Sequence, residues 1–362
     1  MPDRTPLYET TAQAGAQFVE ESGWLIPRDF GDPVTEYNQA KNHAALFDVS
    51  SRSKIEISGA DAGTFLNNLC SNDVKNLSAG NGCEAFFTNI KAKVIAHVFL
   101  YHLEPGSQKG VYWLDAVPGQ AEKIIKHLDH FLISEQVEFA DRTREFAQLH
   151  LAGPEARATL VKALGEDLPD LREHQVALRD LGDGTPCQVR RLDRLGVPGY
   201  DLVCSSAQAP AVWGKLISAG ARPAGSMVHE ALRIEAGTPS YGLDIDENTL
   251  APEVGRIPQS ICYTKGCYLG QEPIVRARDL GHVNRTLQTL TVETGEPIAR
   301  GAKLVRDGKE VGQITSSAAV PGANKTFALA YVRRGNTESG TELEALVGEK
   351  RFKATVGNVP EQ

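Results

Sequence analysis

The stretch Lys265-Gly-Cys-Tyr-Leu-Gly-Gln-Glu272, which continues as PIVRARDLGHVNR to Arg285, carries more chemical information than any other part of this sequence. Gly266 and Gly270 bracket a cysteine and a tyrosine, and glycine permits backbone conformations and close approaches that side chains forbid. Cationic neighbours favour the thiolate form of a cysteine, so Cys267 is a candidate nucleophile or iron–sulfur ligand. The alternative is a small residue that packs between two glycines.

Four cations are concentrated in this stretch although the chain as a whole has a net charge of −8. A basic cluster on a glycine-punctuated segment is typical of a site for a ligand that bears carboxylates or phosphates. The alternative is a solvated loop whose arginines pair with Glu253 or Asp279. The four cations are Lys265, Arg276, Arg278 and Arg285.

The bulk properties indicate an ordinary folded protein of two or three domains, since 362 residues exceed one compact core. The acidic net charge argues weakly against direct nucleic-acid binding. No apolar run approaches the roughly 20 residues that span a bilayer, and the first 17 residues lack a signal-peptide pattern. Six scattered cysteines without a CxxC pair indicate a reducing compartment, so we expect a cytoplasmic protein without a membrane partner. Cys262 and Cys267 form only a weak Cys-x4-Cys signal, and we expect no metal site.

Two short segments share one pattern at a separation of 94 residues. Ile55-Glu-Ile57 predicts a strand that turns at Gly59 into a helix. Leu149-His-Leu151 with Gly153 repeats this strand, turn and helix. The match indicates an internal duplication, although coincidence stays open for so short a segment.

The rest of the chain divides into parts that differ in the spacing of their apolar residues. Apolar spacing predicts helices over 120–132, 207–218 and 227–234, and Gly237 ends the last of these. Residues 237–271 lack periodicity, and a loop of that length is usually functional or a linker. Short strands follow 285, which predicts a small β-barrel or sandwich. We therefore expect domains at 1–145, 146–283 and 284–362.

The octapeptide resembles the K-G-C-[FY]-x-G-Q-E signature of the YgfZ family and its mitochondrial iron–sulfur assembly relatives. These are folate-binding proteins similar to the T protein, the aminomethyltransferase of the glycine cleavage system. Four further segments resemble elements of that superfamily, namely Ala44–Ser50, Ser71–Asp73, Leu232–Asp244 and Val311–Ser316. The resemblance thus covers nearly the whole chain.

The resemblance implies an α+β fold, with three domains in a ring, a C-terminal β-barrel and tetrahydrofolate in the central hole. It also implies that the carboxylate of Glu235 binds the folate pterin, because a carboxylate can accept paired N–H donors. The implied folate-binding residues are Asn89, Glu235, Tyr241, Lys265, Gln271, Arg276 and Arg285.

One departure from the T protein concerns its acidic motif N-E-x-G-G-x-x-D-D. The corresponding stretch runs from Asn89 to His97 and keeps the asparagine, but it lacks both glycines and both aspartates. The expected aid to proton transfer near the folate is therefore missing. His97 could act as a base, but its place in an apolar strand favours a structural role.

The sequence thus leaves three functions open. The favoured one is a YgfZ-type tetrahydrofolate-binding protein that supports assembly or maintenance of iron–sulfur proteins and, through them, tRNA modification. Its partners would be folate and iron–sulfur client or carrier proteins. The alternative is a folate-dependent aminomethyltransferase or methyltransferase, and whether the chain is an enzyme stays open. A non-catalytic scaffold is the third.

Overall fold

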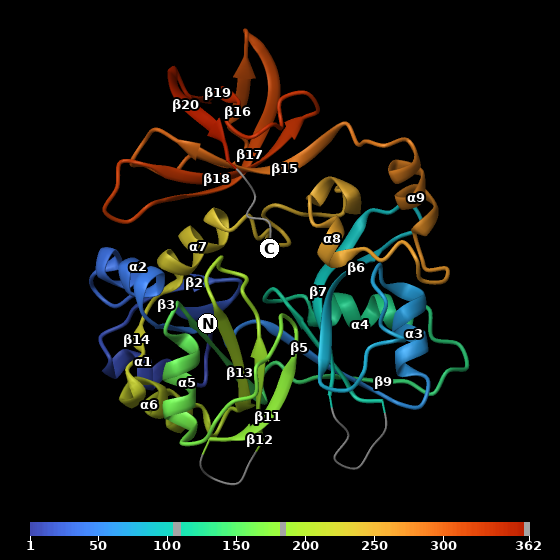
Figure 1. The fold of residues 1–362 in the computed structure, drawn as a ribbon, viewed down its shortest axis with the longest axis vertical. Coiled ribbons are helices and arrows are strands. Elements are labelled where there is room, and N and C mark those ends of the chain that lie inside the picture. Colours follow the sequence, from blue (N-terminus) through green and yellow to red (C-terminus); the bar gives the residue numbers. More distant parts are fainter. Residues whose placement is uncertain (104–109, 182–185, 358–362) are drawn as a thin grey trace.

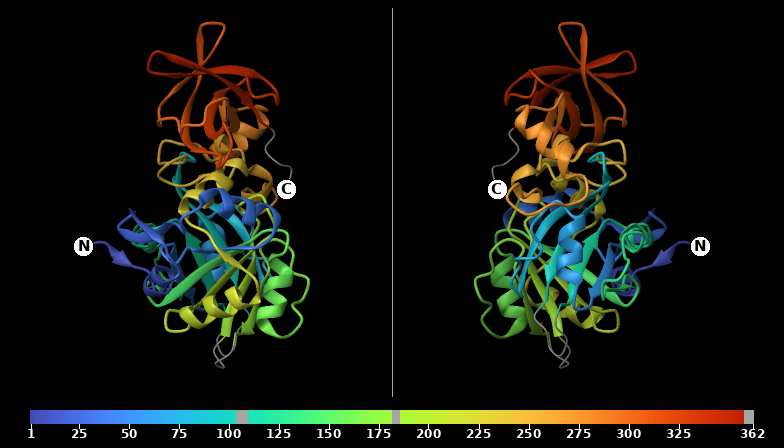
Figure 2. Two further views of the ribbon diagram at one scale, coloured as in Figure 1. Left: turned by 90° about the vertical axis from the view of Figure 1, so that its left-hand side faces the viewer. Right: turned by 90° about the vertical axis from the view of Figure 1, so that its right-hand side faces the viewer.

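The computed structural model describes residues 1–103, 110–181 and 186–357. A closed barrel (orange to red) sits on a body that contains two antiparallel sheets and their helices (Figure 1). Seen from either side, the N-terminal strand projects sideways from this body, and the barrel lies above the body (Figure 2). The α+β class and the C-terminal barrel expected from the sequence are confirmed.

The first sheet has the strand order β6-β7-β8-β5-β9. Helices α3 and α4 cover one face of it, since Phe65, Leu66 and Ile124 pack in one core with Ile55 and Leu114 of the sheet. The bounds are β5 (Ser53–Ser58), α3 (Ala62–Leu69), β6 (Asn81–Thr88), β7 (Val94–His102), β8 (Tyr112–Ala116), α4 (Ala121–Asp129) and β9 (Glu138–Asp141).

The second sheet has the order β11-β12-β13-β10-β4-β14 and is covered by α5 and α6. Leu160 and Trp213 from these helices pack against Leu149 and Leu202 of the sheet. The bounds are β4 (Ala45–Asp48), β10 (Phe146–Ala152), α5 (Ala156–Leu164), β11 (Val176–Asp180), β12 (Pro186–Arg191), β13 (Gly199–Ser205), α6 (Ala209–Ala219) and β14 (Arg222–Pro223).

The two sheets are structural repeats that exchange one strand. Each repeat runs strand, strand, helix, three strands, helix, as β4-β5-α3-β6-β7-β8-α4 and then β9-β10-α5-β11-β12-β13-α6. The leading strand of each repeat joins the other sheet, because β4 pairs with β10 and β9 pairs with β5. The duplication expected from the sequence is therefore seen in the structure, with the matching strands β5 and β10 in fourth place in the two strand orders.

The repeated glycines fill the same role in both halves. Gly59 and Gly153 have positive φ angles of +126° and +130°. A Cβ atom would lie 2.0 Å from the carbonyl oxygen of Gln136 at Gly59, and 2.2 Å from that of His43 at Gly153. Both carbonyls belong to the chain that leads into the exchanged strand, so glycine is what allows that strand to approach.

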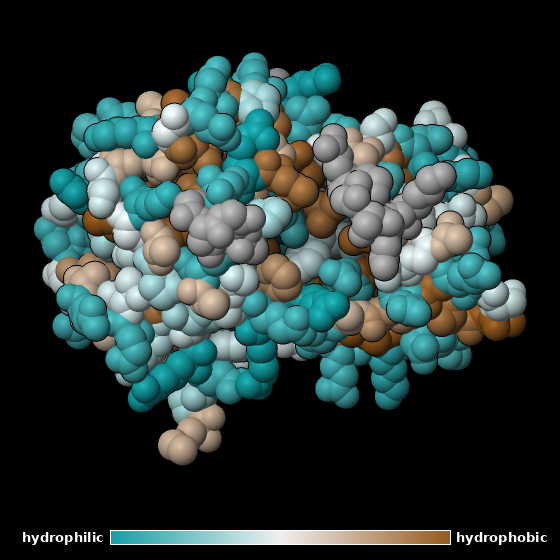
Figure 3. Space-filling view, turned by 90° about the horizontal axis from the view of Figure 1, so that it is seen from below, coloured by the Kyte–Doolittle hydropathy of each residue, from teal (hydrophilic) through white to brown (hydrophobic). Residues whose placement is uncertain are grey.

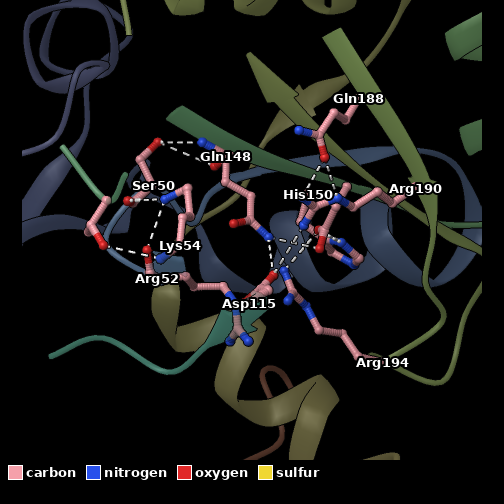
Figure 4. Close-up of polar contacts among 11 residues, drawn as sticks. Ser50, Arg52, Lys54, Asp115, Gln148, His150, Gln188, Arg190 and Arg194 are labelled. Atoms are coloured by element: carbon pink, nitrogen blue, oxygen red, sulfur yellow. Dashed lines mark hydrogen bonds and ion pairs between the residues drawn. The ribbon is translucent and has the colours of Figure 1, made fainter. Parts of the chain in front are cut away.

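Charged side chains, not only apolar ones, fill the space between the sheets (Figure 4). Gln148 donates to Asp115 and Asp201, which are both fully buried. His150 Nδ1 lies 2.7 Å from Asp201 Oδ1, and Arg52 donates to Asp115 at 2.6 Å. Because buried charges need partners, this cluster fixes how the two sheets face each other.

The barrel closes in the order β15-β18-β17-β16-β19-β20 around an apolar core. Its first strand begins at Arg285, and residues 358–362 of the expected last domain, 284–362, lie outside the described residues. The bounds are β15 (Arg285–Val292), β16 (Lys303–Arg306), β17 (Lys309–Ala319), β18 (Thr326–Arg333), β19 (Glu342–Val347) and β20 (Lys350–Val356).

The remaining elements join these parts. A small sheet of order β1-β3-β2 and two helices precede β4, and a helical segment leads into the barrel. The face opposite the barrel is mainly hydrophilic, with hydrophobic side chains in small groups (Figure 3). The bounds are β1 (Asp3–Arg4), α1 (Tyr8–Gln13), β2 (Gln17–Glu21), β3 (Trp24–Asp29), α2 (Pro33–Asn42), α7 (Ser226–Glu235), η1 (Ala251–Val254), α8 (Ile257–Ser260) and α9 (Gln271–Asp279).

Residues 237–271, in which the sequence shows no periodicity, contain the short helices η1 and α8. Helix α9 begins at Gln271, inside the octapeptide, directly after Gly270, which has a φ of +83°. The domain limits at 145 and 283 stay a prediction, and β4 from the first segment lies in the second sheet.

Candidate functional site

A cavity of about 570 Å³, here called the central cavity, lies where the two sheets meet α7 and the β2–β3 hairpin. This volume is typical of a pocket for a small molecule. Apolar residues of its wall include Ile26, Phe47, Val49, Phe99, Val117, Pro118, Pro239 and Leu243. Polar residues of its wall include Glu21, Asp48, Arg52, His97, Arg194, His229, Glu230, Arg233 and Tyr241.

Arg194 presents unpaired donors at this cavity. It is 5% exposed and lies in the connection between β12 and β13. Its Nη2 donates to Asp201 at 3.0 Å, but Nε and Nη1 have no hydrogen-bond partner among the described residues. Leaving buried donors unpaired costs free energy, so a ligand with an acceptor oxygen fits here.

His229, on α7, adds a second unpaired atom. Its Nε2 is buried and lacks a partner among the residues that the structure describes. Burial, together with nearby cations such as Arg194, lowers the pKa of His229 well below its usual value. The ring is therefore neutral at physiological pH. It meets Phe47 edge to face at 5.6 Å, which leaves a nitrogen beside an aromatic wall.

The same face of α7 carries an ion pair. Glu230 accepts from Arg233 Nε at 2.8 Å and from Nη2 at 2.7 Å. Arg233 Nη1 also donates to Asp244 at 2.9 Å. Arg233 is thus held firmly at the cavity wall by two carboxylates.

Glu235, the residue expected to bind the pterin, does not line the cavity. Its Oε2 accepts from the Tyr37 hydroxyl at 2.8 Å and its Oε1 pairs with Lys41 at 2.9 Å. The reason is helical geometry: two residues after Arg233, the side chain points roughly 200° around the helix. The structure therefore places Glu235 against α2, away from the other candidates.

Tyr241 is the only one of the seven implied folate-binding residues that lines the cavity, and His97, considered as a possible base, lines it too. Its hydroxyl accepts from Lys123 at 2.7 Å. Lys123 also pairs with Glu247 and lines a separate groove beside α4. The hydrogen bond between Tyr241 and Lys123 therefore joins a residue of the cavity wall to a residue of the groove wall.

Lys265 is engaged by the protein itself. Its Nζ donates to the carbonyl oxygens of Asn67, Cys70 and Asn72 at 2.6–2.8 Å. These carbonyls belong to the end of α3 and the turn after it. The octapeptide and the Ser71–Asp73 element thus meet in space, and Lys265 holds them together.

The other candidate residues of that stretch lie at or near the surface. Cys267 is exposed, and Gln271 begins α9. Arg276 pairs with Glu272 at 3.1 Å, and Arg285 pairs with Glu253 at 3.2 Å. Arg278 pairs with Asp279. The three arginines thus pair with nearby carboxylates, as in the solvated-loop alternative.

Asn89 lies in the turn between β6 and β7. Its side-chain oxygen accepts from the backbone N–H groups of Lys91 and Lys93. It lines the groove beside α4, not the central cavity. The structure brings Asn89 beside the octapeptide, because Leu269 lines the same groove, but it places Glu235 elsewhere.

Sequence reasoning missed Arg194, His229, Glu230 and Arg233. For the last three a signal was present, because they are spaced by one, three and four residues on a predicted helix and so share a face. Arg194 gave no such signal, since it lies on a loop beside residues with no periodic pattern.

Most of the chain matches two protein-family models. Residues 7–256 match the model of the GCVT N-terminal domain, and residues 285–360 match the glycine cleavage T-protein C-terminal barrel domain. The chain belongs to the glycine cleavage T-protein family. The match covers both the two-sheet body and the barrel.

Curated relatives agree with this family. An aminomethyltransferase of Desulforamulus reducens is 28% identical over 99% of this chain and 97% of its own length. One of Herpetosiphon aurantiacus is also 28% identical, with the same coverage. The crystal structure of glycine cleavage system aminomethyltransferase T from Bartonella henselae has a TM-score of 0.88 at 24% identity, over 99% of this chain and 98% of that one. The last comparison establishes the fold.

No helix among the described residues is long and apolar enough to cross a membrane.

Proposed function

We propose that the chain binds a reduced folate, tetrahydrofolate or a one-carbon derivative, in the central cavity and takes part in one-carbon transfer on it. Aminomethyl or methyl transfer is the reaction class that fits relatives named aminomethyltransferase. The observation that carries the proposal is Arg194, with two unpaired buried donors at a cavity of about 570 Å³.

The wall of the cavity fits the chemistry of a folate. A pterin is a flat ring with a carbonyl acceptor, which suits the free N–H groups of Arg194. Phe47 and Phe99 offer aromatic surface for ring contact. His229 supplies a neutral nitrogen beside Phe47. The residues present are therefore able to hold both the polar edge and the flat face of such a ligand.

Calorimetry with 5-formyltetrahydrofolate tests the proposal. We expect binding by the full chain, and we expect Arg194→Lys to weaken it about tenfold or more, since each lost charged hydrogen bond contributes about 1.5–3 kcal/mol. Lysine keeps a cation for Asp201 but lacks the planar fork. The control is Arg144→Lys, an exposed arginine paired with Asp3. Absence of binding by the wild-type chain contradicts the proposal.

A second function is supported by the octapeptide. The YgfZ-type role, support of iron–sulfur protein assembly or maintenance and through it tRNA modification, would use the exposed thiol of Cys267. Its test is complementation of a strain that lacks its own family member. Cys267→Ser is expected to abolish complementation and to leave folate binding intact, and full complementation by this variant contradicts the role.

A further inference from the structure

His97 sits at the wall of the central cavity in an unusual setting. It lies on β7, is 6% exposed, and has aromatic neighbours in Phe86 and Phe99, whose ring centroids lie 5.2 and 5.5 Å away. Its Nε2 lies 2.7 Å from Oε1 of Glu84 on the adjacent strand β6. The imidazole ring is thus held by a hydrogen bond at one nitrogen and lies near two aromatic rings.

Glu84 is held in its ionised form. It is fully buried, and burial alone would raise the pKa of a carboxyl. Against this burial, the Arg256 guanidinium and His97 hold the pKa of Glu84 well below its usual value. Arg256 Nη2 donates to Oε2 at 2.6 Å, and Nε donates to Oε1. Glu84 therefore acts as a permanent acceptor toward the histidine.

This acceptor fixes the tautomer of His97. A carboxylate beside Nε2 requires hydrogen on that nitrogen, so the neutral ring carries its lone pair on Nδ1. No hydrogen bond to Nδ1 occurs among the described residues. The arrangement is that of a carboxylate-oriented imidazole at a ligand cavity.

Other acids of the wall are already engaged. Asp48 accepts from Thr5 at 2.6 Å and from the Ser50 N–H at 3.0 Å. Glu230 is bound at both oxygens by Arg233. Glu21 accepts from Ser226 at one oxygen, and its other oxygen has no hydrogen-bond partner among the residues that the structure describes. Glu21 is thus the competing acceptor that an experiment has to separate from His97.

We propose that Nδ1 of His97 accepts a hydrogen bond, and then a proton, from an N–H group of the ligand in the central cavity. The ligand is the reduced folate or the amine joined to it, so the inference rests on the proposed function. In the step, the ligand nitrogen is positively charged, as an amine becomes when it gains a bond during one-carbon transfer; its N–H bond breaks, the electron pair stays on the nitrogen, which becomes neutral, and the proton bonds to Nδ1. The imidazolium that forms donates from Nε2 to Glu84, whose charge stabilises it. Returning the proton restores the neutral ring.

Several titratable groups surround this pair and belong in its pH dependence. Glu173 and His174 from the chain before β11 lie near Glu84 and Arg256. Glu21, Arg194 and His229 also line the central cavity. The variants below therefore test the histidine separately from a carboxylate.

The experiment combines nitrogen-15 NMR of the full chain with calorimetry at several pH values, using 5-formyltetrahydrofolate. His97→Gln keeps an amide N–H for Glu84 but removes the basic nitrogen. We expect neutral wild-type His97 to carry hydrogen on Nε2 alone, and its signals to shift when the folate binds. We expect wild-type affinity to be lower in acid than at neutral pH, since a ring with hydrogen on Nδ1 cannot accept from the ligand. His97→Gln should lose this dependence.

The controls distinguish the role of His97 from folate binding itself. His102→Gln, on the same strand but outside the cavity wall, should behave as wild type. With tetrahydrofolate and a lipoate-carried aminomethyl group, His97→Gln should lower kcat about a hundredfold with little change in KM. Two results overturn the role of His97 while folate binding stands. One is hydrogen on Nδ1 in the neutral ring. The other is a pH dependence of affinity that disappears in Glu21→Gln and persists in His97→Gln. No folate binding by the wild-type chain overturns both.

Discussion

The hydroxyl of Tyr37 donates to Oε2 of Glu235 across 2.8 Å and thereby ties α2 to the far end of α7. Lys41, one turn further along α2, pairs with the other oxygen at 2.9 Å. Burial, and then the hydrogen bond to Glu235 and its charge, raise the pKa of Tyr37 well above its usual value. Glu235 thus serves the joint between two helices, one of which carries the cavity wall.

Glu235→Gln should therefore affect stability more than ligand binding. We expect the free energy of unfolding to fall by about 1 kcal/mol, because the ion pair is only partly buried, and folate affinity to stay within about threefold. Urea unfolding and calorimetry measure these quantities. The double variant with Tyr37→Phe should lose less than the sum of the single changes. A tenfold loss of folate affinity at unchanged stability would show that Glu235 takes part in folate binding.

Lys54 should make stability depend on pH. Burial lowers its pKa to about 7, from a usual value of 10.5, while its Nζ donates to the carbonyls of Ser50 and Arg52. Above pH 7 the unfolded chain binds the proton that the folded chain has released, so stability rises with pH. Relative to Lys54→Met, the wild-type unfolding free energy should rise by up to about 1.4 kcal/mol per unit between about pH 7.5 and 9.5. Parallel curves for the two proteins contradict this.

Gly153→Ala should damage the fold severely. The new Cβ would lie 2.2 Å from the His43 carbonyl, in a left-handed backbone conformation. We expect a loss above about 3 kcal/mol in urea unfolding. The matched control is Gly214→Ala, in the interior of α6 with open space around it, which should gain about 0.5–1 kcal/mol. Equal effects of the two changes would refute the role of the exchanged strand.

Lys265→Met should loosen the turn after α3. Three buried carbonyls lose their shared donor, and we expect a loss of about 3 kcal/mol. Maleimide labelling should then reach Cys70, which is buried in the wild type, while Cys267 reacts in both proteins. The exposed Lys75→Met is the control and should stay within about 0.5 kcal/mol. Unchanged stability in Lys265→Met would make Lys265 available for a ligand.

The sequence was informative where pattern is local. Alternation at Ile55 and Leu149 and the two glycines predicted the strands β5 and β10 and the helices that follow them, α3 and α5. Beyond Arg285, turn residues and short apolar runs predicted the barrel, which closes as expected. These features depend on neighbours along the chain, so one sequence suffices to see them.

The cavity depends on residues that are far apart in sequence, and this is why it was not predicted. His97, Arg194 and Arg233 come from a strand, a loop and a helix, and no motif joins them. A family signature drew attention to the octapeptide, but its lysine has a structural task. His97 shows the opposite error: the apolar strand pattern correctly predicted its burial, but burial did not exclude a place at the cavity.

The exchange of β4 and β9 also has a meaning for synthesis on the ribosome. β4 emerges about a hundred residues before β10, the strand it pairs with. The first sheet in turn waits for β9, which comes after its own two helices. Neither half can be finished early and set aside, and a chain cut between α4 and β9 would lack a strand in both sheets. The two-sheet body should therefore fold as one unit, late in translation, and expose unpaired strand edges until β13 has emerged.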